Sequence, residues 1–463
     1  MKSILCLLQI GCSAAAMAAE TMIPLSAQQN VNVTIYNDNR ALIKDERRVS
    51  LMEGLNQLAF QGVSANMMPQ TALLKGEGLS TLEQNFNYDV LTKDAMLRKS
   101  VGEKVVVEYI DPATGKVSRD TAKILSYTGG KPVLEIDGKI ETDYPGRVVF
   151  ESVPPNLRAE PTLIVSTKAQ KEGNETVELN YLTSGLSWRA DYVAKLNAAE
   201  DKIDLNGFVT LTNNSGADYK KALLQLVAGD VHVVRDYGDR NARFVMAAKT
   251  ASVGYVADNE MVAEALTDFY IYTVPHKTDL LSQQTKQVAL FSATDVGTKK
   301  TYELNYPFQV YSTEVLDVKP EIYLTFENSD TNKLGKPLPK GTVRLYKEDS
   351  KGNMQFVGED SINHTADKEK VRLHLGTSFN LKASMKRTQH RKLSEKLSVG
   401  TYEVTFKNGS DASANVELTL RFPDDFKLME ESQHGERVTS NTIKWVVAVP
   451  AKGESKLIYK VQY

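Results

Sequence analysis

The sequence predicts a mainly β protein, with several β-sandwich or small β-barrel domains in series and few short helices. Three observations predict this fold class: apolar and polar residues alternate in many short runs, turn-forming residues separate the runs, and helical patterns are rare. A period of two puts successive side chains on opposite faces of a strand, one buried and one in water. Many short strands between turns are typical of sandwiches and small barrels.

These patterns also place individual elements along the chain. The alternating runs are clearest at 31–36, 415–422, 443–449 and 457–463, and Asn- and Gly-rich turns lie at 213–216 and 407–410. Thr92 is a suitable N-cap for a short helix through Arg98, and a second short helix is expected from Glu260 to Phe269. The segment from Asp236 to Glu264 has no clear period, so a loop is expected there.

Breaks in the pattern divide the chain into a leader and four β domains. The strongest break is Val153-Pro154-Pro155 with the nearby Pro161, because proline interrupts strand pairing. The expected parts are a signal peptide at 1–19, an N-terminal β domain at 28–98, a small β barrel at 101–152, a central β domain at 160–320 and a C-terminal β-sandwich domain at 321–463.

The first residues have the layout of a secretory signal peptide. Lys2 precedes a short apolar run, small residues follow up to Ala19, and Ala16-Met17-Ala18 fits the cleavage rule. The run is much shorter than the roughly 20 residues of a membrane-spanning helix, and no later segment is apolar enough to be one. We therefore expect a periplasmic or extracellular protein. A lipid anchor on Cys12 is the alternative, disfavoured because Gln9-Ile10 matches the lipoprotein pattern poorly.

After removal of the leader, the chain would have no thiol and little net charge. Cys6 and Cys12 both lie in the leader, which excludes disulfides, cysteine nucleophiles and thiolate metal sites from the rest. Loss of Lys2 leaves 55 of the 56 basic residues against 58 acidic ones, a formal charge of −3. A general nucleic-acid binder would have a strong basic excess, so no nucleic-acid partner is expected.

Several stretches together resemble one protein family. They are YNDNRALIKDERRVSL from Tyr36, LEQNFNYDVL from Leu82, PGRVVFESVPPNLRAEPTL from Pro145, YLTSGLSWRADYVAKL from Tyr181, VTLTNNSGADYKKALLQLVAGDV from Val209, IYTVPHKTDLLSQQTKQVALFSA from Ile271, LGKPLPKGTVRLYKED from Leu334 and FVGEDSINHT from Phe356. In order and spacing they resemble the domain-of-unknown-function 4139 family of bacterial secreted proteins, some relatives of which are labelled mucoidy inhibitor A-like. The resemblance implies a β-rich exported protein, with no established activity and no catalytic residue to transfer. The mucoidy label would imply a link to exopolysaccharide, but many members of that branch have a coiled-coil insertion, and no such heptad run exists here.

The densest mix of aromatic and charged residues is Trp188, Arg189, Asp191 and Tyr192. In a strand, Trp188 and Tyr192 would face one side, and Arg189 and Asp191 the other. One interpretation is a sugar or peptide platform, because aromatic faces stack and Arg and Asp form hydrogen bonds. The favoured alternative is a core Trp and Tyr with an ion pair at the surface. These four are the binding candidates; no catalytic residue, metal ligand or cofactor is predicted.

Each of the other polar groupings has a plain structural alternative. Glu359, Asp360, His364 and His374 could bind zinc if folding brought them together. The remaining groupings are a possible acid–base pair at Asp230 and His232, paired carboxylates at 424–425 and 430–431, and a basic stretch from Lys382 to Lys396. The basic stretch could meet anionic lipids or acidic polysaccharide, but a solvated hinge between strands is favoured.

The leading hypothesis is a non-enzymatic envelope protein that binds or organises an envelope protein or glycan through its β surfaces. It follows from the lack of a catalytic motif and from the several strand-rich modules. The first alternative is a hydrolase or metal-dependent enzyme acting on envelope polysaccharide or peptide, with its residues gathered from distant segments. The second is an assembly factor that pairs an exposed edge strand with a client protein.

Overall fold

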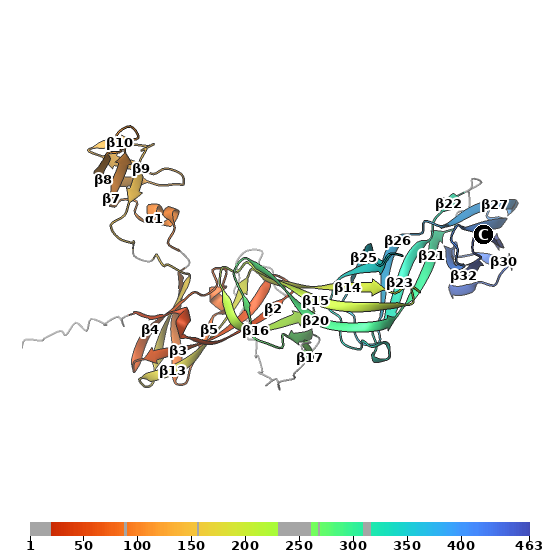
Figure 1. Cartoon of the computed structure of the whole chain (residues 1–463), viewed down its shortest axis with the longest axis horizontal. Helices are drawn as coiled ribbons and strands as arrows, with labels where there is room; N and C mark the ends of the chain where they lie inside the picture. The colour runs from red at the N-terminus through yellow and green to blue at the C-terminus, as the bar shows by residue number, and fades with distance from the viewer. Residues whose placement is uncertain (1–19, 88–89, 155–156, 230–260, 267–268, 309–315) are drawn as a thin grey trace, which may run out of the picture.

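The computed structural model describes residues 20–87, 90–154, 157–229, 261–266, 269–308 and 316–463 (Figure 1). Within these residues the strands form six sheets, which confirms the predicted mainly β fold class. The helical elements in the same residues are α1 (Lys93–Lys99) and the 3-10 turns η1 (Leu25–Ala27), η2 (Pro69–Thr71) and η3 (Asp330–Asn332). All but one of these sheets follow one another along an elongated molecule (Figure 1).

Two sheets form the N-terminal end of the long axis. The four-stranded sheet has the order β1 (Glu20–Ile23), β4 (Gly54–Gln61), β12 (Thr162–Ala169) and β6 (Leu79–Asn87). The eight-stranded sheet has the order β17 (Val262–Leu266), β18 (Phe269–Thr273), β16 (Tyr219–Ala228), β2 (Gln28–Tyr36), β3 (Arg40–Leu51), β13 (Gly173–Ser184) and β5 (Leu73–Lys75), with β19 (Thr278–Leu280) beside β16.

Three further sheets continue toward the C-terminus. The central sheet has the order β20 (Gln284–Gly297), β15 (Lys202–Asn213), β14 (Leu186–Leu196), β24 (Gly341–Glu348) and β25 (Met354–Ile362). The six-stranded sheet has the order β26 (Lys370–Thr377), β23 (Glu321–Glu327), β21 (Lys299–Pro307), β29 (Ala414–Arg421), β32 (Thr442–Val449) and β31 (Glu436–Thr439). The C-terminal sheet has the order β22 (Leu316–Val318), β27 (Leu381–Ser394), β28 (Leu397–Asn408), β33 (Glu454–Gln462) and β30 (Lys427–Glu431).

These pairings cross two of the predicted domain borders. β4 pairs with β12 and β2 pairs with β16, so 28–98 and 160–320 share both N-terminal sheets. β14 and β24 are parallel neighbours, so the central sheet also spans the border at 320–321. Alternation locates a strand and its buried face, but it does not show which distant strand is its neighbour, and the linear division fails for that reason.

The remaining sheet stands apart from the long axis (Figure 1). Its order is β10 (Lys139–Glu141), β9 (Val133–Ile136), β8 (Val117–Ser126), β7 (Lys104–Ile110) and β11 (Arg147–Val149), all within the predicted unit 101–152. Leu97 of α1 joins the buried apolar cluster of this sheet. The predicted N-cap of α1 is confirmed, because the Thr92 hydroxyl accepts a hydrogen bond from the Ala95 N–H at 3.1 Å.

Two larger apolar cores lie between the sheets along the long axis. The first extends through both N-terminal sheets and the inner face of the central sheet, and it includes Leu324 of β23 and Leu373 of β26. The second lies between the six-stranded and C-terminal sheets and includes Leu418 and Trp445 on one side and Phe406 on the other. The six-stranded sheet therefore contributes to both cores, while the outer face of the central sheet lies outside both.

Two local predictions are wrong. Residues 262–266 form strand β17, paired with β18, instead of a helix from Glu260 to Phe269. The stretch from Lys382 to Lys396 is not a hinge, because β27 occupies most of it and pairs with β28. In both places hydrogen bonding to a neighbouring strand outweighs the weak preference of the local sequence for a helix or a hinge. The leader at 1–19 and most of the loop predicted from Asp236 to Glu264 lie outside the described residues. In the described part of the chain, no helix has the length and apolarity needed to cross a membrane.

Candidate functional site

Trp188 and Tyr192 point from β14 into the core. Trp188 is 5% exposed and Tyr192 is 0% exposed. The Trp188 Nε1–H donates to the Val227 carbonyl at 3.3 Å, and the Tyr192 hydroxyl donates to the Pro339 carbonyl at 2.6 Å. A platform made from these two rings is therefore excluded, because their faces are covered by other side chains. Their role is the core role that the sequence favoured.

Arg189 and Asp191 lie on the opposite, outer face of the central sheet. Asp191 is buried, and its carboxylate accepts hydrogen bonds from Thr210 Oγ1 at 2.7 Å and Arg344 Nη1 at 3.0 Å. Arg189 Nε lies 3.3 Å from the same carboxylate. Burial acts to raise the pKa of Asp191, but the hydrogen bonds from Thr210 and Arg344 and the two guanidinium charges outweigh burial and lower this pKa. The carboxylate is thus ionised at neutral pH and connects three strands.

This network gives the stability of the chain a specific dependence on pH. Because the pKa of Asp191 is lower in the folded chain than in the unfolded chain, its carboxylate stabilises the fold above the unfolded pKa. The stabilisation disappears as the pH falls through the folded pKa. We expect Asp191→Asn to lower the free energy of unfolding by about 1–3 kcal/mol at pH 7, and by much less near pH 3.

Urea unfolding at several pH values measures this difference. The control is Asp411→Asn, which removes an exposed carboxylate 3.2 Å from Lys452 and is expected to cost less than about 1 kcal/mol. If Asp191→Asn lowers the free energy of unfolding by the same amount at pH 7 and at pH 3, the lowered pKa of Asp191 is contradicted.

The strand register shows which aromatic residues share the outer face with Arg189 and Asp191. Phe208 of β15 lies opposite Asp191, and Phe356 of β25 lies opposite Tyr346 of β24. The rings of Tyr346 and Phe356 meet edge to face with centroids 5.7 Å apart, and Phe356 is 57% exposed. The accessible aromatic groups of this face therefore come from β15, β24 and β25, and not from β14.

Polar groups lie between these rings. Arg344 contacts Asp191 at 3.0 Å on one side and Glu359 at 3.1 Å on the other. Phe208 and Tyr346 are separated by two strand spacings and by four residues along β24, roughly 16 Å. We call the set Phe208, Tyr346, Phe356, Arg189, Asp191, Arg344 and Glu359 the central outer face. It offers ring surfaces and fixed hydrogen-bonding groups along one open strip.

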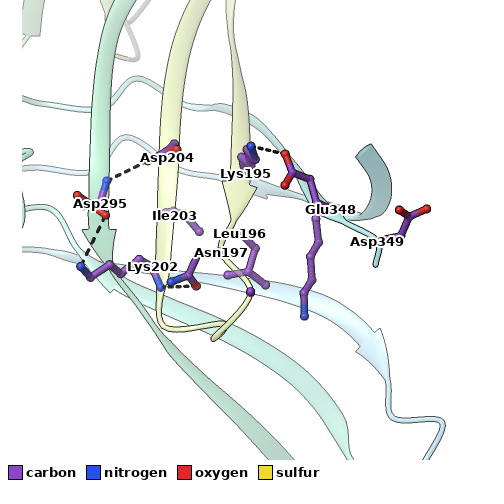
Figure 2. Close-up of a pocket in the computed structure, with 11 residues that line it drawn as sticks. Lys195, Leu196, Asn197, Lys202, Ile203, Asp204, Asp295, Glu348 and Asp349 are labelled. Atoms are coloured by element: carbon purple, nitrogen blue, oxygen red, sulfur yellow. Dashed lines mark hydrogen bonds and ion pairs between the residues drawn. The ribbon is translucent and has the colours of Figure 1, made fainter. Parts of the chain in front are cut away.

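The strip ends in a polar pocket of about 370 Å³ (Figure 2). Figure 2 shows its side chains around the turn from β14 to β15 and beside the ends of β20 and β24. Lys195 Nζ lies 2.6 Å from Glu348 Oε1, and the Asp295 N–H donates to Asp204 Oδ1 at 3.0 Å. Lys202 Nζ lies 3.6 Å from Asp295 Oδ1, and the charge of Lys202 lowers the pKa of Asp295. With its acids and bases paired, the pocket presents donors and acceptors without one dominant charge.

The four residues considered as a possible zinc site do not converge on one point. His374 Nε2 lies 2.6 Å from Glu321 Oε2, and the His374 N–H donates to Asp360 Oδ2 at 2.7 Å. Glu359 belongs to the central outer face, and His364 Nδ1 accepts a backbone N–H. Within the described ranges, no three His, Cys, Asp or Glu side chains are grouped closely enough to hold a metal ion.

The other groupings from the sequence have separate surroundings. Glu431 accepts a hydrogen bond from Trp445 Nε1 at 2.9 Å, while Glu430 pairs with Lys460 at 2.8 Å. Asp424 accepts a hydrogen bond from the Asn441 side chain. Residues 230 and 232 lie outside the described residues. The edge-pairing hypothesis stays a prediction. Among the described strands, β6 is at the edge of the four-stranded sheet, because only β12 pairs with it there, and its Leu82 is exposed.

Sequence reasoning missed the aromatic members of the central outer face. The available signal was the alternation along β24, where Thr342, Arg344 and Tyr346 alternate with the buried Val343 and Leu345. A scan against protein-family models and a search of curated proteins both gave no match for this chain.

Proposed function

We propose that this protein is an exported, non-catalytic envelope protein that binds an envelope glycan through the central outer face. One observation supports the proposal: the exposed ring of Phe356, the half-buried rings of Phe208 and Tyr346, and fixed polar groups from four strands share a single strip that leads into a polar pocket. Binding sites of this kind combine aromatic surface for contact area with a few placed polar groups for orientation. An open strip suits a long polymer better than a small enclosed ligand.

The polar groups of the strip are held in place before a ligand arrives. Asp191 is fixed by Thr210 and Arg344, and Arg344 is in turn held between Asp191 and Glu359. A site that is already ordered loses less conformational entropy on binding. Hydroxyl groups of a sugar are both donors and acceptors, so they match a strip that presents the Arg344 guanidinium beside the Glu359 carboxylate. The buried Asp191 orients Arg344 and does not itself face a ligand.

Export is the second part of the proposal. Its support is the leader at 1–19, with Lys2, a short apolar run and a small-residue cleavage site, together with the resemblance to a family of bacterial secreted proteins. Cell fractionation followed by N-terminal sequencing tests it. Recovery of the protein from the cytoplasm with Met1 retained would contradict export, whatever the result of the glycan experiments.

We expect Phe356→Ala to weaken glycan binding about tenfold, because one exposed ring contributes about 0.5–1.5 kcal/mol beyond the area it buries. Affinity electrophoresis in gels that contain neutral or acidic bacterial polysaccharides measures this as a loss of retardation. Phe379→Ala is the matched control, because Phe379 is an exposed phenylalanine next to the C-terminal sheet, away from the strip. Absence of retardation with every polysaccharide, or equal losses for both variants, would contradict the proposal.

A further inference from the structure

The outer face of the C-terminal sheet has a regular array of cations. Along β27, β28 and β33 one side is buried in the second core, as shown by Ala383, Val404 and Leu457. The register places the alternate residues of these strands together on the other side. The basic residues on this side are Lys382 and Lys386 and, past a bulge, Arg391 of β27, Lys407 of β28, and Lys456 and Lys460 of β33.

Few acidic groups balance this array. The Glu403 carboxylate lies 2.9 Å from Lys386 Nζ and 3.6 Å from Lys456 Nζ, so it forms ion pairs with both. The Glu430 carboxylate lies 2.8 Å from Lys460 Nζ. Glu454 lies opposite Lys407 in the register. Asp317 of β22 lies opposite Ser384 and adds a fourth carboxylate, while Lys427 of β30 lies opposite Gln462 and adds a seventh cation. Seven cations therefore meet four carboxylates on this side, and the face keeps a positive excess.

The excess is greatest in the hairpin that joins β27 to β28. We call residues 388–399 the basic hairpin. Its side chains from 388 to 396 are exposed, and Glu395 is its one acidic residue. Arg391, Lys392 and Lys396 form no ion pair with any residue that the structure describes. Leu393, between these cations, is 46% exposed, so the end of the hairpin is amphipathic.

The position of the basic hairpin makes it accessible to a large surface. β27 and the rest of the C-terminal sheet lie at one end of the elongated molecule, far from the small sheet (Figure 1). Contact with a large surface through this end would leave the central outer face accessible. Lysine is a compact point charge and does not impose the bidentate geometry of arginine, so a lysine-rich face matches a diffuse negative surface.

We propose that the basic hairpin and the adjoining cationic sheet face bind the anionic phospholipid headgroups of a bilayer. Each clustered Lys or Arg near an anionic membrane strengthens binding about fivefold, and an apolar side chain at the tip enters the headgroup region. A soluble acidic polymer would also be attracted by the charge, but it would not require the exposed Leu393. The site is separate from the central outer face, so the proposal does not depend on glycan binding.

Co-sedimentation of the purified protein with vesicles tests the proposal. The probes are vesicles of phosphatidylcholine alone and vesicles of phosphatidylcholine with phosphatidylglycerol. We expect binding to the anionic vesicles only, weakening as salt is added because salt screens exposed charges. The triple variant Arg391→Gln, Lys392→Gln, Lys396→Gln is expected to bind about 100-fold more weakly, and Leu393→Ser several-fold more weakly.

The matched control is the triple variant Lys116→Gln, Lys123→Gln, Lys139→Gln, which removes the same charge from exposed positions in and next to the separate sheet formed by β7 to β11. It is expected to bind like the unmodified protein. Equal weakening by both triple variants, or no binding to anionic vesicles, would overturn the proposal. Hairpin-dependent binding to heparin without binding to anionic vesicles would overturn it in favour of a soluble polyanion. Circular dichroism of each variant shows whether its fold is retained.

Discussion

Replacing Arg47 by Ala is expected to lower the free energy of unfolding by about 3–5 kcal/mol, because it leaves a buried carboxylate without its partner. Arg47 is 0% exposed, and its Nε and Nη2 donate to Asp45 Oδ2 at 3.0 and 2.7 Å. Its Nη1 donates to the Ile23 carbonyl at 2.9 Å and to the Gln61 carbonyl at 2.7 Å. One side chain on β3 therefore connects the eight-stranded sheet to β1 and β4 of the four-stranded sheet.

The neighbouring residue provides the control. Arg48 is exposed on the same strand, so Arg48→Ala is expected to change the free energy of unfolding by no more than about 0.5 kcal/mol. Chemical unfolding followed by circular dichroism measures both variants. If Arg47→Ala lowers the free energy of unfolding no more than Arg48→Ala does, the contacts of Arg47 do not stabilise the junction between the two sheets.

Replacing Trp445 by Ala is expected to destabilise the second core by about 3–5 kcal/mol. Trp445 is 0% exposed, stacks on Tyr459 with ring centroids 5.4 Å apart, and meets Phe422 edge to face at 6.4 Å. Its removal leaves a cavity, and it also leaves Glu431 without the Nε1–H donor at 2.9 Å.

Calorimetry and fluorescence together locate the effect. The chain has two tryptophans, so in the Trp445→Ala variant the emission comes from Trp188 in the first core. We expect a calorimetric transition at lower temperature that precedes the change in Trp188 emission, because the two cores are separate clusters. Val446→Ala is the control, since this neighbour faces solvent and its loss leaves no cavity. Simultaneous loss of both signals would show that the two cores unfold as one unit.

Local patterns predicted those features that depend on neighbouring residues. Thr92 caps α1 because its hydroxyl reaches an N–H three residues ahead, a contact within one turn. The opposite faces of Trp188 and Arg189 follow from strand geometry, which puts consecutive side chains on opposite sides. The basic stretch at 382–396 was recognised as a charged surface, but its strand was missed because exposed polar residues give no alternation.

The sequence by itself determined that this chain is mainly β, that strands lie at 31–36, 415–422, 443–449 and 457–463, and which side of β14 is buried. Only the tertiary structure decided that 28–98 and 160–320 share two sheets, and that Phe208, Tyr346 and Phe356 join Arg189 and Asp191 on one face. The physical reason is the range of the interactions. Burial on a strand is set by a two-residue period that any short segment displays, whereas strand partners are selected by packing and hydrogen bonding between segments far apart in the chain.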